Sequence, residues 1–175
     1  IHANLNLHDD QGSGLSFHTN REDTIAKQDM TFELSRINLK EFRRILPYMP
    51  DIEGWIGAEA HYIDSGPYMM VSSDLRVDEF KYEGSALGNW EFSGVYLPGE
   101  EKDHHLDAYI RRDGKEIAHL GGIYLPAAEG TGSLSADMAF EHFPLNVVNP
   151  FVPDRMVELN GDLDGTLSMK GDPAK

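Results

Sequence analysis

Cysteine is absent from this chain of 175 residues, and basic side chains are scarce. Without cysteine there is neither a disulfide framework nor thiol chemistry, and the absence suits an oxidising compartment, where stray thiols are a liability. The chain has 15 lysine and arginine residues against 30 aspartate and glutamate residues, which gives a net charge of −15. This charge argues against nucleic-acid partners and against adhesion to anionic membrane surfaces, because both reward clustered cations.

Long hydrophobic runs and the common catalytic motifs are also missing. No apolar stretch reaches the ~18–20 residues of a membrane span, and no signal peptide is present. There is no G-x-S-x-G motif and no P-loop. The chain begins with Ile1 instead of Met, so we expect a piece of a longer protein whose targeting and anchoring segments lie outside it. Its apolar fraction of 40% is that of an ordinary folded domain.

Alternation of apolar and polar residues is the main pattern, and it is clearest in Val157–Met169. Odd-numbered residues there are apolar or glycine, and even-numbered residues are polar. Strand side chains alternate between faces with a period of two, so we predict one long strand with an apolar face. Gly161 and Gly165 would leave gaps in that face, where another group can approach the backbone closely.

Similar alternating segments, separated by turn residues, occupy most of the chain. We predict hairpins at Asp9–Gly14 and at Arg112-Asp113-Gly114, and a polar loop at Thr19–Gln28. About ten strands joined by short turns, without a βαβ rhythm, predict a mainly β domain. The other predicted strands are Ala3–Leu7, Leu15–Phe17, Met30–Leu34, Ile52–Tyr62, Tyr68–Val77, Trp90–Leu97, Leu106–Ile110, Lys115–Leu125 and Gly132–Phe140.

One segment, Ile37–Met49, has helical periodicity instead. Leu39, Phe42 and Ile45 follow helical spacing, which predicts a short amphipathic helix. Asn38 suits its N-cap, and Pro47 would end it. A second segment, Phe143–Pro153, contains three prolines and is predicted to be a loop or one helical turn.

Two segments resemble each other, Ile37–Tyr62 and Phe143–Met169, with an offset of about 107 residues. Each runs from a proline-interrupted apolar stretch through Asp into an alternating strand with paired glycines. Either these are two helix-to-strand transitions with common turn chemistry, or they are like units of an elongated array. We interpret residues 1–175 as a single β-rich segment, divisible in the second case into related units at about 1–63 and 64–175.

The end of the chain carries a more specific pattern. After Asn149-Pro150-Phe151, the sequence fits L-x-G-x-L-x-G-x-L-x-x-x-G-x-P, from Leu159 to Pro173. Leu145–Lys175 thereby resembles a signature of TamB-like translocation and assembly module proteins, which are relatives of the AsmA-like family. Phe32–Tyr62 resembles a degenerate copy of the same pattern.

The resemblance implies both a fold and a function. The fold would be mainly β, a long curled antiparallel-rich sheet forming an open apolar trough, β-taco-like, with one or two short helices. The chain would be a non-catalytic part of a periplasmic protein of Gram-negative bacteria, anchored in the inner membrane outside this segment. It would conduct phospholipid, or another acyl-chain ligand, towards the outer membrane. The full-length chain would support protein assembly there with an outer-membrane barrel protein.

Apolar residues on the alternating strands are the candidates for lining this trough. No cofactor, metal or catalytic group is expected. The candidate lining residues are Ile52, Ile56, Trp90, Phe92, Leu134, Met138, Phe140, Val157, Leu159, Leu163, Leu167 and Met169.

A carbohydrate-binding β-sandwich module is the alternative hypothesis, with Trp55 and Trp90 as a sugar-stacking platform. Trp90 shares a strand face with Phe92, so packing suits it better. Trp55 lies opposite Ile56 in the alternation and is the better candidate for an exposed aromatic side chain. A sandwich would cover the apolar rows with a second sheet, whereas a trough would leave them partly uncovered.

The densest polar cluster is Glu100–His105, where Asp and His could in principle hold a metal ion. However, His104 and His105 are adjacent and would point to opposite faces of an extended strand, so a solvated loop is the better interpretation. His61, His119 and His142 are scattered singly on predicted strands and are interpreted as surface or half-buried side chains. Carboxylate pairs carry little information, because 30 acidic residues make some pairs inevitable.

Overall fold

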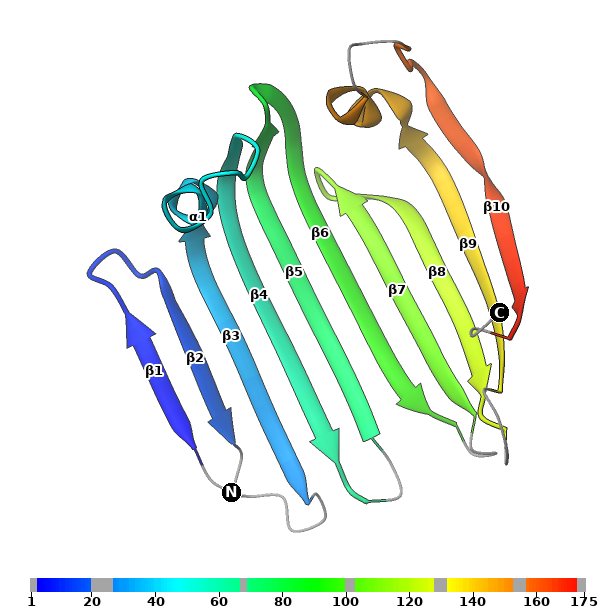
Figure 1. The fold of residues 1–175 in the computed structure, drawn as a ribbon. Helices are drawn as coiled ribbons and strands as arrows, with labels where there is room; N and C mark the ends of the chain where they lie inside the picture. The colour runs from blue at the N-terminus through cyan, green and yellow to red at the C-terminus, as the bar shows by residue number, and fades with distance from the viewer. Residues whose placement is uncertain are drawn as a thin grey trace.

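A single sheet of ten antiparallel strands accounts for most of the molecule (Figure 1). The computed structural model describes residues 3–19, 27–66, 69–99, 103–127, 132–152 and 157–172. Each strand pairs with its neighbours in the chain, and β1 and β10 form opposite edges, so the sheet is not closed. The mainly β prediction is confirmed. The strands are β1 (Asn4–His8), β2 (Gly14–Thr19), β3 (Gln28–Asn38), β4 (Ile52–Asp64), β5 (Met69–Tyr82), β6 (Ser85–Pro98), β7 (His104–Arg112), β8 (Lys115–Leu125), β9 (Ser133–Pro144) and β10 (Asp162–Gly171).

Short turns join several of the consecutive strands. Asp113 and Gly114 join β7 to β8, with φ angles of 49° and 77°. Positive φ at both central residues is the geometry that matches the twist of flanking strands, so the predicted hairpin is confirmed. In the turn from β1 to β2, Asp9 Oδ1 accepts hydrogen bonds from the backbone N–H groups of Gln11 (2.8 Å) and Ser13 (2.9 Å). Those bonds hold the pKa of Asp9 below its ordinary value.

The predicted polar loop at Thr19–Gln28 lies mainly outside the described residues. Its first residue belongs to β2 and its last to β3, and residues 20–26 are not described. The pairing of β2 with β3 nevertheless runs over the whole length of β2, from Gly14 opposite Ser35 to Thr19 opposite Met30.

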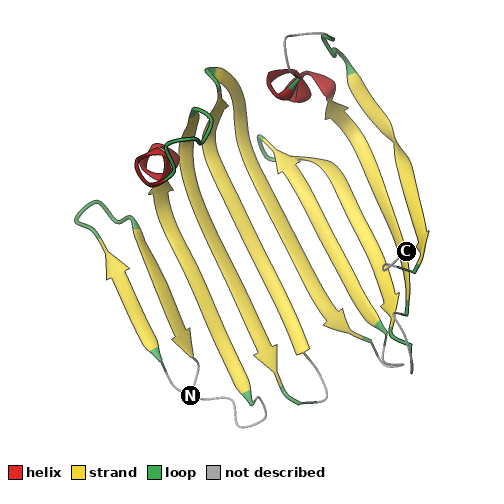
Figure 2. Cartoon of the chain, in the orientation of Figure 1, coloured by secondary structure: helices red, strands yellow, loops and turns green. Residues whose placement is uncertain are grey.

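Two short helices lie at the same end of the sheet (Figure 2). The first, α1 (Leu39–Ile45), begins as predicted at Asn38, whose Oδ1 accepts a hydrogen bond from the backbone N–H of Lys40 at 3.0 Å. Pro47 follows its end, and Leu39 is its buried anchor. The second is the 3-10 helix η1 (Leu145–Phe151), which follows β9.

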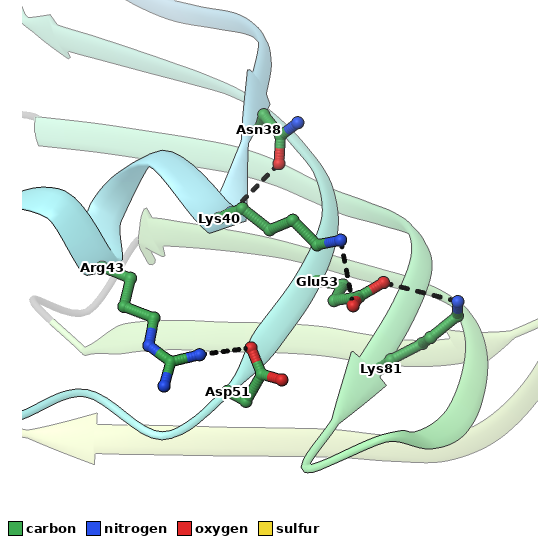
Figure 3. A network of polar contacts seen from close by, with 6 residues as sticks. All are labelled: Asn38, Lys40, Arg43, Asp51, Glu53 and Lys81. Carbon is green, nitrogen blue, oxygen red and sulfur yellow. Dashed lines mark hydrogen bonds and ion pairs between the residues drawn. The ribbon is translucent and has the colours of Figure 1, made fainter.

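Ion pairs tie α1 to the strand that follows it (Figure 3). Glu53 on β4 contacts Lys40 at 3.0 Å and Lys81 on β5 at 3.4 Å. The hydrogen bond from Lys40, and then that from Lys81, lowers the pKa of Glu53 from its ordinary value. Arg43 contacts Asp51 at 2.9 Å in the loop between α1 and β4. These contacts are partly exposed, so they orient the helix more than they stabilise it.

The register shifts in several of the strand pairs, and three of these bulges lie near this end at residues with positive φ. In β3, β5 and β9 the register shifts where Arg36, Glu79 and His142 have φ of 48°, 53° and 48°. Each bulge places two residues opposite one, which bends the strand and increases its twist. Phe140 and Phe143, three residues apart, lie on either side of the His142 bulge. The sequence pattern did not predict these bulges.

The last strand is shorter at its start than predicted. The prediction of one strand over Val157–Met169 is wrong for residues 157–161, because β10 begins at Asp162. The side-chain amide of Asn149 bonds the backbone of Leu159 in both directions, at 2.7 Å and 2.8 Å. Gly161 has φ of 92°, so the backbone turns there before entering the sheet. Alternation in the sequence therefore continues through a loop that is tied to η1.

The region predicted as loop or one helical turn is divided between two elements. Phe143 and Pro144 belong to the end of β9, and Pro150 lies inside η1.

The two similar segments of the sequence have the same order of elements in the structure. In each, a bulge is followed by a short helix, a loop and a strand. A glycine with positive φ lies near the start of that strand, Gly54 within β4 and Gly161 just before β10.

Candidate functional site

Strand pairing brings the apolar residues of the strands together on one side, which we call the apolar face. Its central row consists of directly paired residues on consecutive strands. The central row from β4 to β10 is Ala60, Ser73, Gly94, Ala108, Leu120, Met138 and Leu167. The row on one side is Ala58, Leu75, Phe92, Ile110, Ala118, Phe140 and Gly165. The row on the other side is Tyr62, Val71, Tyr96, Leu106, Gly122, Ala136 and Met169.

The opposite side, the polar face, carries the intervening residues. One of its rows is Glu59, Asp74, Ser93, Tyr109 and His119, again through direct pairs. The two faces therefore differ in polarity, as the alternation of apolar and polar residues in each strand predicts. An antiparallel sheet with one apolar and one polar face normally packs its apolar side against another layer.

Within the described residues, no such layer covers the apolar face. Leu167 is 63% exposed, Met169 59% and Phe92 37%. No large side chain in this part of the chain is fully buried. The buried apolar residues there are Leu39, Leu87, Ile117, Ala118, Ala136 and Val147.

The centre of the apolar face is hollowed. The central row is made of small residues over β4–β7, from Ala60 to Ala108, and the rows beside it carry larger side chains such as Phe92 and Tyr96. This apolar hollow has a volume of about 490 Å³, within the ~300–1,000 Å³ of ordinary small-molecule sites. Its lining includes Val71, Leu75, Phe92, Gly94, Tyr96, Leu106, Ala108, Ile110, Leu120 and Met138.

The structure brings most of the predicted lining residues onto this face. Among the candidate lining residues predicted from the sequence, only Phe92 and Met138 line the apolar hollow itself. Leu163 lies opposite Phe143, just beyond the β9 bulge, and Ile52 lies opposite Tyr82 at the end of β4. The others on the face are Ile56, Trp90, Leu134, Phe140, Leu167 and Met169.

Two of the candidate lining residues lie outside the strands. Val157 and Leu159 lie before β10, outside the sheet, because the Asn149 side chain holds Leu159 in the loop. Conversely, Leu75, Leu106 and Leu120 line the hollow but are not among the candidate lining residues predicted from the sequence. Their alternation was visible, but only the pairing register shows that they lie beside Phe92 and Met138.

The 3-10 helix η1 connects the end of β9 to a contact with β5. Phe151 at its end packs on Tyr82 of β5, with ring centroids 4.4 Å apart. Figure 1 shows η1 at this end of the sheet, between the ends of β6 and β9. The helix thus bounds one end of the apolar face.

The two tryptophans lie in different environments. Trp90 stacks with Phe92 at 6.1 Å, and its Nε1–H donates to the backbone oxygen of Leu87 at 3.0 Å. Trp55 lies on the polar face, where it lines a hollow of about 400 Å³ with arginine and carboxylate side chains. The Arg36 guanidinium lies 5.0 Å from the centre of its ring, so Trp55 is half-buried and partly covered.

His104 and His105 each contact a different side chain. His104 contacts Tyr96 Oη at 2.6 Å through Nδ1, and His105 contacts Asp103 at 2.8 Å through Nε2. The two rings therefore have separate partners, Tyr96 on β6 and Asp103 just before β7. Residues 100–102 of the predicted cluster lie outside the described residues. Among the residues that the structure describes, no three metal-ligating side chains converge.

Each of the other predicted single histidines pairs with an aspartate. His61 lies 2.7 Å from Asp29, His119 2.8 Å from Asp107 and His142 2.8 Å from Asp164. The backbone N–H of His142, and then its ring, lowers the pKa of Asp164 from its ordinary value. A hydrogen bond to Asp107 raises the pKa of Tyr109 beside His119.

Comparison of the chain with family models, with curated proteins and with solved structures gave no match. Throughout the described ranges, the helices are too short or too polar to cross a membrane.

Proposed function

We propose that this chain is a non-catalytic segment that holds and conducts the acyl chains of phospholipid along its apolar face. The observation that carries the proposal is the uncovered apolar face with its central hollow, on a sheet whose other face is polar. Because the side chains of each strand alternate, about half of them lie on the apolar face. Within the described residues, no second layer packs against these side chains.

The physical chemistry of the hollow suits an acyl chain. Each CH₂ group that leaves water for an apolar site contributes about 0.8 kcal/mol, and small residues at the floor leave room for it. We propose that the sheet curls around the apolar face into an open trough. The polar face, with Glu59 and Asp74, keeps the other side solvated.

The setting of this activity is also a proposal. It rests on the resemblance of Leu145–Lys175 to the TamB-like signature. On that basis the segment lies in the periplasm, within a protein anchored in the inner membrane, and the full-length protein meets an outer-membrane barrel protein.

Two single-cysteine variants test the proposal, because the chain has no other cysteine. Ala108→Cys places an environment-sensitive fluorophore in the apolar hollow, and Ser72→Cys places it on the polar face, outside the lining of the hollow. Addition of monomeric lysophosphatidylcholine should shift the emission of the Ala108 label to the blue and leave the Ser72 label unchanged. Equal responses, or none, would contradict the proposal. Organic extraction of the purified protein followed by mass spectrometry should also find bound lipid.

The alternative, a carbohydrate-binding β-sandwich, has less support. The described strands all belong to one sheet, and Arg36 lies over the ring of Trp55. Strong binding on a glycan array, together with lipid-free protein, would favour this alternative.

A further inference from the structure

Two cationic side chains lie on the apolar face, beside the turn that joins β7 to β8 (Figure 1). Arg112 is paired with Trp90 and follows Ile110 by two residues, so alternation places it on the face that carries the apolar hollow. Lys115 is directly opposite Arg112, and directly paired side chains extend from the same face. Two residues along a strand span roughly 7 Å. Positive charge therefore lies just beyond one end of the apolar hollow.

This pair of cations is unfavourable for folding by itself. Like charges directly opposite each other destabilise a strand pair, and the Arg112 side chain is only 21% exposed, so part of its hydration is lost. The ion pair of Arg112 with Asp113 is long, with 3.8 Å between Nε and Oδ2. Oδ1 of Asp113 already accepts hydrogen bonds from the backbone N–H and the side-chain amide of Asn89. Within the described residues, the two cations make no other ion pair, so an anionic ligand would relieve their repulsion.

The Arg112 guanidinium is nevertheless held in a fixed place. Its Nε–H donates to the backbone oxygen of Leu87 at 2.8 Å, and its central carbon lies 6.0 Å from the centre of the Trp90 ring. Among the described residues, the side chain makes no other hydrogen bond, so the two terminal nitrogens keep their donors. A positioned guanidinium with this fork unoccupied is suited to bind two oxygens of a carboxylate or a phosphate.

We propose that Arg112, assisted by Lys115, binds the anionic head of the acyl ligand while the acyl chain lies in the apolar hollow. The head would be a carboxylate or a phosphate, which share the geometry that a guanidinium recognises. This inference rests on the proposed function and adds the polar group that the ligand must carry. It also gives the ligand a direction. From the head beside the β7–β8 turn, the chain runs over Ile110 and Ala108 towards Tyr96, all of which line the hollow.

A pair of fluorescent probes tests the proposal, because cis-parinaric acid and its methyl ester share one acyl chain and differ in the charge of the head. The wild type should bind the acid about tenfold or more tightly than the ester. Arg112→Gln should lower the affinity for the acid to that for the ester and leave the ester unchanged. Arg112→Lys keeps the charge without the fork and should retain part of the preference. Unchanged binding of the ester shows that the hollow of each variant is intact.

The neighbouring arginine provides the matched control. Arg111 lies on the polar face, where it pairs with Glu116, so Arg111→Gln removes the same charge from the other side of the strand. This variant should keep the full preference for the acid. Added salt should weaken binding of the acid by the wild type and not binding of the ester, a comparison that needs no variant to fold.

Phosphate probes separate a lipid head from a free anion. Lysophosphatidic acid should displace cis-parinaric acid from the wild type, and its inhibition constant should rise about tenfold or more in Arg112→Gln. Inorganic phosphate at the same concentration should not displace the probe, because it lacks the contribution of a buried acyl chain. Displacement by inorganic phosphate alone would show a free-anion site and overturn the proposal.

The two probes also distinguish failure of this inference from failure of the proposed function. Equal affinity of the wild type for the acid and the ester would overturn the role of Arg112 and leave the acyl-chain site standing. Binding of neither probe would overturn both. Loss of the preference in His104→Leu, and not in Arg112→Gln, would place the head at the opposite end of the hollow, where His104 contacts Tyr96.

Discussion

Leu163 and Leu87 show how differently this sheet uses the same residue type. Leu163 on β10 is 40% exposed, and Leu87 on β6 is 4% exposed. We predict that Leu163→Ala lowers the free energy of unfolding by well under the ~2–5 kcal/mol typical of buried leucines, because little cavity results. Leu87→Ala, the matched control, should cost an amount within that range. Urea denaturation of both variants measures the difference.

A charge at the same position sharpens the test. Leu163→Glu should still fold, because its carboxylate reaches water from the exposed face instead of being buried without a partner. If Leu163→Ala is as costly as Leu87→Ala and Leu163→Glu does not fold, another layer covers this part of the face in solution.

Acid should weaken the contact between α1 and the sheet through Glu53. Its hydrogen bonds with Lys40 and Lys81 lower its folded-state pKa below the ordinary 4.5. A carboxyl group of this kind contributes stability that is present above its unfolded-state pKa and lost as pH falls through the folded-state pKa. We predict that Glu53→Gln flattens the fall in the urea midpoint between about pH 6 and about pH 3.

The two lysines provide the control for this pH prediction. A double Lys40→Met and Lys81→Met variant removes the cause of the pKa shift and should flatten the same part of the profile. If the profiles of wild type and Glu53→Gln are parallel, Glu53 does not contribute to the acid sensitivity.

At the scale of elements, Asn149 connects η1 to the segment before β10. Its amide both accepts from and donates to the backbone of Leu159. We predict that Asn149→Ala costs ~1–3 kcal/mol of unfolding free energy, because two half-buried backbone groups lose their partner. Faster hydrogen exchange of the Leu159 amide should accompany the loss. Asn146→Ala, an exposed position in the same helix, should change neither measurement.

Element boundaries show where sequence reasoning succeeded. Lys115–Leu125 was predicted with its observed bounds, because the Asp113-Gly114 turn and clean alternation agree. The start of β10 was wrong, because the alternation of Val157–Leu159 satisfies a loop bound by Asn149 as well as a strand. Hydrogen bonds from a side chain ten residues away leave no trace in a period-two pattern.

Bulges were missed for a related reason. Leu34 and Ile37 lie three residues apart on either side of the Arg36 bulge, as Val77 and Phe80 do around Glu79. A spacing of three breaks a period of two, so it reads as the end of a strand. The positive φ of Arg36 also has no sequence signal, since arginine rarely adopts it.

At the scale of the molecule, the sequence predicted two-faced strands but not how they line up. Alternation decides which residues of one strand share a face, whereas the register between strands depends on turns and bulges. The row of small residues from Ala60 to Ala108 exists only across four strands, so no single segment reveals it. Because its side chains are small, that row leaves the hollow in the apolar face.

Filling this hollow should separate ligand binding from folding. An added Cβ at Gly94 would lie 3.7 Å from the Cβ of Ala108, an ordinary contact, so Gly94→Leu can enter the apolar hollow without disturbing the backbone. We predict an intact fold and about tenfold or more weaker binding of cis-parinaric acid, measured by its fluorescence, because the leucine occupies the space of the acyl chain. Gly121→Leu is the matched control, because it adds the same side chain on the polar face, where no atom lies within 4 Å of its Cβ. It should bind the probe as the wild type does. Wild-type affinity in a folded Gly94→Leu variant would mean that acyl chains do not occupy the apolar hollow, whose lining residues lie on β5–β9.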